Sequence, residues 1–97
     1  MAHYVTLLKF TSKGLAGLKK SPKRSEDFKK AVKAAGGEVL ECVWLMGHYD
    51  GLIRFDSPNA ETTSALIAGL ALAGNVTTQT FRAFDGKEFA EILKHTK

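Results

Sequence analysis

The sequence predicts an α+β fold in which four strands and two helices follow one another in the order β-α-β-β-α-β. The chain has 97 residues, which is enough for a single domain spanning 1–97. Two Ser-Pro dipeptides each introduce a segment of helical character, and four other segments are rich in alternating β-branched and aromatic residues. Two split β-α-β units form a ferredoxin-like sandwich: a four-stranded antiparallel sheet in the order 4-1-3-2, with both helices on one face.

The first strand is expected over Ala2–Phe10, where both alternating faces are apolar, as in a central strand. The first helix is expected to begin at Ser21-Pro22, with the serine hydroxyl as its cap, and to stop at Gly36-Gly37. Phe28 and Val32 belong to its apolar stripe, and lysines cover its other side. This helix therefore has one face for the core and one for solvent.

The next two strands are expected over Val39–Met46 and Asp50–Asp56, as a hairpin with a two-residue type II′ turn at Gly47-His48. That turn places Glu41 opposite Arg54, a favourable pair of opposite charges. We interpret the pair as structural, although Arg54 could bind a ligand carboxylate if a second subunit enclosed it.

The two faces of this hairpin differ in composition. One face has the residues of a core: Leu40, Cys42, Trp44, Ile53 and Phe55. The other face is mixed, and its apolar members are Val43, Leu45 and Leu52. Because this open face is too apolar to leave in water, we expect a homodimer or a higher homo-oligomer.

The second helix is expected to begin at Ser57-Pro58. Its body, Thr62–Ala73, contains no charged residue and is apolar nearly all round, which predicts burial on more than one side. Gly74-Asn75 ends it, and Val76–Phe84 is the last strand. A capping-box pattern at Asp85–Glu88 predicts a short C-terminal helix.

The formal net charge is +4, and nine bases against two acids lie within residues 9–33. Lysines without interleaved arginines and exposed aromatic residues make nucleic acid an unlikely partner and are typical of a solvated helix face. The single cysteine, Cys42, excludes an intrachain disulfide and is expected to be a small buried apolar residue. The uncharged stretch 62–80 is too polar to span a bilayer, and the start lacks the features of a signal peptide, so we expect a cytoplasmic protein with no membrane association.

No metal or cofactor is expected. The three histidines, His3, His48 and His95, show no metal-ligand spacing, and no carboxylate cluster is expected to join them. The sequence also lacks a phosphate-binding loop and a dinucleotide fingerprint.

The predicted topology brings polar residues together at one edge of the sandwich, where the first strand ends and the hairpin turns. Tyr49 is expected to lean into the core edge, and Asp50 to look into the open face near Lys9. With Arg54 and Asn75, these are the candidate ligand-binding residues. The first turn of the helix at Ser21-Pro22 also favours an anion at this edge.

Several motifs resemble the GYD-domain family, small prokaryotic proteins named for a Gly-Tyr-Asp signature. They are Met46-Gly47-His48-Tyr49-Asp50 at the hairpin, the opening strand through Thr11, Ser21-Pro22-Lys23-Arg24, Gly36-Gly37, Gly74-Asn75-Val76 and Phe81-Arg82-Ala83-Phe84. One departure is Lys13-Gly14, where the family has glutamine before the glycine. The resemblance implies a ferredoxin-like fold similar to the dimeric α/β-barrel proteins, and a family without an established activity.

Three functions follow as hypotheses. The first is a binding or sensing module for a small anionic or phenolic ligand at a subunit interface, held by Arg54, Lys9 and Tyr49. The second is an interaction subunit whose basic helix docks an acidic partner. The third is a cofactor-independent enzyme, isomerase-like or monooxygenase-like, with Asp50 or His48 as general base.

Overall fold

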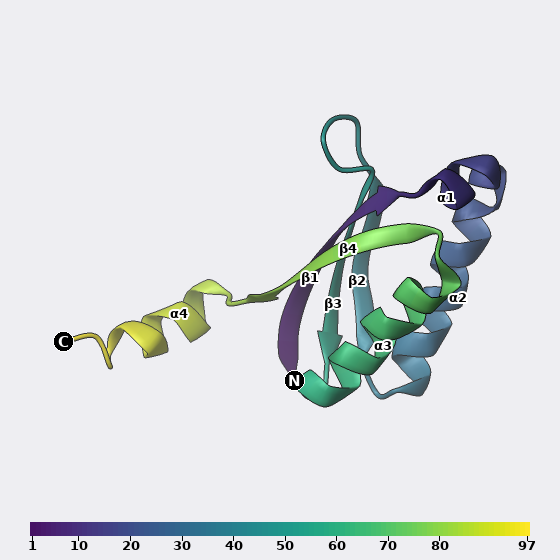
Figure 1. Cartoon of the computed structure of the whole chain (residues 1–97). Coiled ribbons are helices and arrows are strands. Elements are labelled where there is room, and N and C mark those ends of the chain that lie inside the picture. Colours follow the sequence, from purple (N-terminus) through teal and green to yellow (C-terminus); the bar gives the residue numbers. More distant parts are fainter.

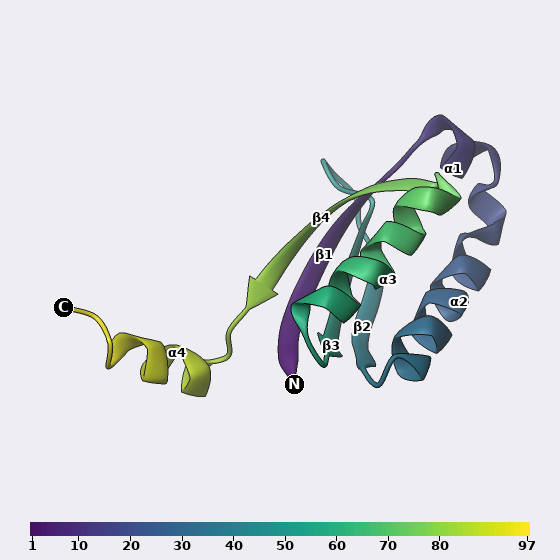
Figure 2. The ribbon, with the colours of Figure 1, turned by 60° about the horizontal axis from the view of Figure 1, so that its bottom comes forward.

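Four strands form one antiparallel sheet in the order β2-β3-β1-β4, which confirms the predicted topology. The structure, a computed structural model, describes all 97 residues. The elements are β1 (Ala2–Phe10), α1 (Ser12–Ala16), the 3₁₀ turn η1 (Leu18–Lys20), α2 (Ser21–Ala34), β2 (Glu38–Trp44), β3 (Gly51–Ser57), α3 (Ala60–Ala73), β4 (Val76–Ala83) and α4 (Gly86–Leu93). Helices α2 and α3 cover one face of the sheet and leave the other face open (Figures 1 and 2).

The core lies between this sheet and α2. Phe28 and Val32 of α2 and Ile53 and Phe55 of β3 are buried together. The Phe55 ring meets Phe28 edge to face, with ring centroids 5.8 Å apart, and stacks on Tyr4 of β1 at 5.7 Å. Such aromatic contacts add to the hydrophobic stabilisation that burial provides.

Both helices begin differently from the sequence prediction. Because η1 runs directly into α2, the residue before Ser21 already has helical dihedral angles, and Ser21 is not an N-cap. Its buried hydroxyl instead accepts a hydrogen bond from Trp44 Nε1 at 2.9 Å. Helix α3 begins at Ala60 with Asn59 as its N-cap, whose side chain accepts a hydrogen bond from the Thr62 N–H at 2.8 Å. The predicted start positions of the two helices were therefore close to the observed ones, but the predicted capping residues were wrong.

The β2–β3 register is confirmed over its last part, since Glu41 lies opposite Arg54. The prediction of a two-residue turn is wrong. Strand β2 ends at Trp44 and β3 begins at Gly51, so residues 45–50 form a longer loop. This loop projects beyond the end of the sheet (Figure 1). At its base the Leu45 N–H donates to the Asp50 carbonyl at 2.9 Å, and the Asp50 N–H donates to the Leu8 carbonyl of β1 at 2.8 Å.

Two apolar segments are more exposed than the sequence predicts. A β-bulge between Val39 and Glu41 changes the alternation of β2, so Val39 packs against the core and Leu40 is exposed. Trp44, expected in the core, is half-exposed. On α3, Leu72 is 89% exposed, so this apolar helix is buried on the sheet side alone.

The capping box of α4 is confirmed, and α4 extends away from the rest of the domain (Figures 1 and 2). Its apolar side chains, Phe89, Ile92 and Leu93, are all exposed. An isolated helix of this length is marginal in water, so a partner surface for this apolar face would stabilise it.

Candidate functional site

A groove of about 430 Å³ lies on the helix side of the sheet, with α2 and α3 as its walls and β1, β2 and β3 as its floor. Small residues on the walls, Ala31 of α2 and Gly69 and Ala73 of α3, leave this space unfilled. A Cβ atom built on Gly69 would meet no atom within 4 Å. The floor is apolar, and the groove is large enough for a small molecule.

Polar side chains of α2 and β2 meet along one wall of this groove. Trp44 donates to Ser21, as described above, and Cys42 Sγ lies 3.0 Å from Ser25 Oγ. Cys42 is partly buried and lines the groove, so the thiol is more accessible than the sequence analysis predicts.

The structure divides the predicted ligand-binding residues between the two faces of the sheet. Asp50 and Asn75 line the groove. Lys9 and Arg54 lie on the open face, because Leu8 and Ile53, their neighbours in sequence, pack into or against the core. The predicted edge therefore does not form one site.

Two side-chain positions at this edge differ from the prediction. Asp50 does not pair with Lys9, because its Oδ2 atom accepts a hydrogen bond from the Phe10 N–H at 2.9 Å. Tyr49 does not lean into the core edge. Its hydroxyl donates to Gln79 Oε1 at 2.7 Å, and Gln79 lies opposite Leu7 on the open face. His48 is exposed and contacts the Tyr49 ring edge to face.

Other residues at this edge join α1 to the start of β4. The Thr11 side chain caps α1 by accepting the Gly14 N–H at 3.1 Å, and it donates to the Gly74 carbonyl at 2.6 Å. Lys13 Nζ donates to the Ala73 carbonyl at 2.7 Å. A Cβ atom on Gly14 would overlap the Asn75 carbonyl oxygen, so glycine is required there for this close approach. These contacts hold the end of the groove in place.

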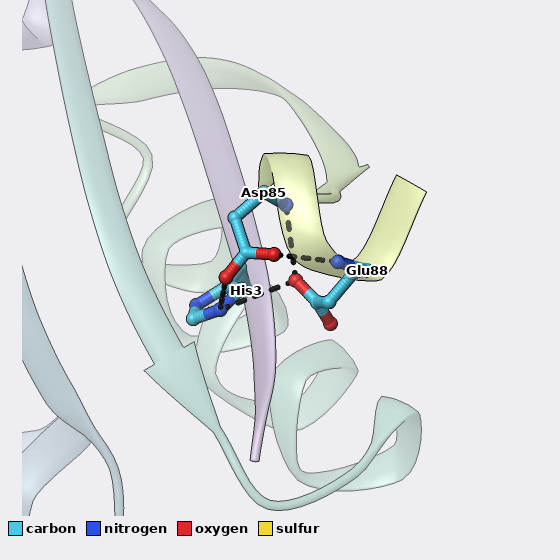
Figure 3. A group of neighbouring side chains, drawn as sticks. All are labelled: His3, Asp85 and Glu88. Carbon is cyan, nitrogen blue, oxygen red and sulfur yellow. Dashed lines mark hydrogen bonds and ion pairs between the residues drawn. The ribbon is translucent and has the colours of Figure 1, made fainter. Parts of the chain in front are cut away.

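A cluster of charged residues surrounds His3, which the sequence did not predict (Figure 3). His3 Nδ1 is hydrogen-bonded to Asp56 of β3, its partner in the β1–β3 register. His3 Nε2 lies 3.3 Å from Glu88 Oε1 and 3.6 Å from Asp85 Oδ2, both at the start of α4. The capping box was visible in the sequence, but the register that brings His3 to it was not.

The ligand atoms of His3, Asp85 and Glu88 lie within 4.8 Å of one another, which is a spacing that a metal ion could use. The two carboxylates already accept backbone N–H groups in the capping box, and both pair with the imidazole. This arrangement is that of a protonated histidine among carboxylates, and it ties α4 to β1 and β3. The expectation that no carboxylates surround a histidine was wrong.

The environment of His3 predicts a pH-dependent stability. Its pKa is raised above the usual value of 6.5, first because of the hydrogen bond with Asp56. The negative charges of Asp56, Glu88 and Asp85 raise the pKa further, and desolvation opposes them. Since the folded-state pKa is the higher one, the stabilisation from His3 is complete below pH 6.5 and is lost as the pH rises through the folded-state pKa. The effect is moderated by solvent, because the His3 side chain is 34% exposed.

We therefore expect His3→Gln to destabilise the domain more at about pH 6 than at about pH 8.5 in urea unfolding. His95→Gln is the matched control, because His95 is exposed near the C-terminus and forms no ion pair. An equal effect of His3→Gln at both pH values would contradict this account of the cluster.

The fold and the groove define a small ferredoxin-like α+β domain with an apolar groove on its helix side. The sequence model of the GYD-domain family matches residues 4–93, and the chain belongs to this family. This confirms the resemblance seen in the sequence motifs.

Comparison with solved structures finds a likeness to the crystal structure of At3g17210 from Arabidopsis thaliana. The two chains are 13% identical and superimpose with a TM-score of 0.48, over 88% of this chain and 95% of that chain. Among curated proteins, none matches this sequence. None of the helices is long and apolar enough to cross a membrane.

Proposed function

We propose that this GYD domain is a binding module that takes a small, mainly apolar molecule in the groove between α2 and α3. The observation that supports this most is the groove itself, whose volume of about 430 Å³ lies within the range of small-molecule sites. Its apolar floor would provide affinity, and the polar groups of Asp50, Asn75 and Arg24 would orient the ligand.

The groove contains two natural reporters, since Trp44 is the only tryptophan of the chain and Cys42 its only cysteine. A ligand in the groove would change the fluorescence of Trp44 and protect Cys42 from alkylation. The neutral apolar dye N-phenyl-1-naphthylamine is a suitable probe, because it carries no charge.

Gly69→Phe tests whether the groove is the binding site. There is open space at the Gly69 Cβ position, so the new ring would fill the groove without displacing the backbone. We expect this variant to lose at least about tenfold in affinity for the dye, together with the protection of Cys42. Both are measured by fluorescence titration and by the rate of alkylation.

Leu72→Phe is the matched control, because Leu72 belongs to the same helix, is 89% exposed and does not line the groove. It should bind the dye as the wild-type chain does. A Gly69→Phe variant that binds the dye and protects Cys42 like the wild type would contradict the proposed site.

A second candidate function is self-association through the open face of the sheet. Phe81 on β4 is 50% exposed on this face, and Val43 on β2 and Leu45 in the loop after it are also exposed. Lys9, Arg54 and Tyr49 lie on the same face and would contact a second copy or a ligand enclosed by it. Sedimentation equilibrium at micromolar concentrations tests for this association.

The remaining hypotheses have less support from the geometry. On α2, Lys23 pairs with Asp27 at 3.2 Å and Lys29 with Glu26 at 3.1 Å, which reduces the positive charge offered to an acidic partner. The enzyme hypothesis uses Asp50 as a general base, but the Asp50 carboxylate already accepts a hydrogen bond from the Phe10 N–H.

A further inference from the structure

Arg24 is a cation of the groove with spare hydrogen-bond donors. It belongs to α2 and lines the groove. Its Nη1 group donates to the Gly14 carbonyl at 3.5 Å, a long hydrogen bond, and it forms no ion pair with a carboxylate. Since a guanidinium carries five N–H donors, most of its donors are left for another group.

The acidic residues of the groove are both engaged elsewhere. Asp27 pairs with Lys23 at 3.2 Å on the exposed surface of α2. Asp50 Oδ2 accepts the Phe10 N–H at 2.9 Å, and Asp50 forms no ion pair with Arg24. Arg24 is therefore a basic residue of the groove lining, with its guanidinium near Gly14 and Gly17, and no carboxylate of the chain forms an ion pair with it.

We infer that the ligand of this groove is an apolar molecule with one anionic group, such as an aryl or alkyl carboxylate, whose charge pairs with Arg24. This inference rests on the proposed binding function and adds the chemical class of the ligand. The planar guanidinium accommodates two oxygens of one anionic group, and the partial burial of Arg24 limits screening by salt. The apolar part of the ligand then lies over Phe28, Ile53 and Leu70.

Two dyes that differ in one charged group test the inference. The dye 1-anilinonaphthalene-8-sulfonate has the same aromatic framework as N-phenyl-1-naphthylamine and adds a sulfonate. We expect the wild-type chain to bind the anionic dye about tenfold more tightly than the neutral one, with protection of Cys42 showing that both occupy the groove. Arg24→Gln should remove this preference, so that the two dyes bind the variant with equal affinity.

Lys30→Gln is the matched control, because it removes the same charge from an exposed residue of α2 that does not line the groove and forms no ion pair. It should keep the preference for the anionic dye, and Arg24→Lys should keep part of it. Equal binding of both dyes with protection of Cys42 would overturn the anionic class and leave the proposed function standing. If neither dye protects Cys42, the proposed function itself fails.

Discussion

Replacement of Phe55 by alanine is expected to lower the free energy of unfolding by about 3–5 kcal/mol. Phe55 is fully buried at the centre of the sheet and contacts Phe28 and Tyr4 through its ring. The variant loses the burial of the ring and leaves a cavity that the neighbouring strands cannot close. Because domains of this kind are stable by only about 5–15 kcal/mol, the loss is a large part of the total.

Urea unfolding followed by circular dichroism measures this loss. Phe84→Ala is the control, since Phe84 is half-exposed and its ring faces the Arg82 guanidinium at 4.5 Å. We expect the control to cost about 1 kcal/mol or less. Equal costs for the two variants would show that the core does not centre on Phe55.

The second large effect is expected at the open face, where Phe81→Glu should weaken self-association by at least about 100-fold. Phe81 lies opposite Val5 of β1, on the open face of the edge strand β4. In the proposed oligomer a carboxylate at this position would be buried without a partner, which is strongly unfavourable. In the monomer the same side chain is in contact with water, so the fold should be retained.

Sedimentation equilibrium of the wild type and the variant measures this change. Leu72→Glu is the control, because it places the same charge on the outer surface of α3, away from the open face. The control should associate as the wild type does. A wild-type chain that remains monomeric at tens of micromolar, a typical range for weak dimers, would refute self-association.

The order of strands and helices was predictable because each element carries its own local signal. The alternation in Ala2–Phe10 and the capping box at Asp85–Glu88 act within a few residues, and both predictions were confirmed. Even the pairing of Glu41 with Arg54 could be predicted, since cross-strand charge pairs restrict the register of a hairpin.

The candidate site was less predictable, because its geometry depends on contacts between distant segments. Asp50 was expected to face Lys9, but the backbone N–H of Phe10 offers its carboxylate a hydrogen bond at 2.9 Å. A contact between residues 40 positions apart leaves no periodic pattern in the sequence. The same holds for the Tyr49–Gln79 hydrogen bond, which places the tyrosine on the opposite face from the one expected.

By itself, the sequence determined the fold class, the strand order and the family, because hydrophobic periodicity and helix caps are local properties of the chain. The tertiary structure alone decided where the groove lies and which side chains enter it. The groove exists because small residues line both helices, Ala31 on α2 and Gly69 on α3, and leave the space between them unfilled. The cluster around His3 likewise exists because the strand register brings Asp56 beside it and the end of β4 carries the capping box to it. Both features depend on distances between elements, which packing sets and local residue patterns do not encode.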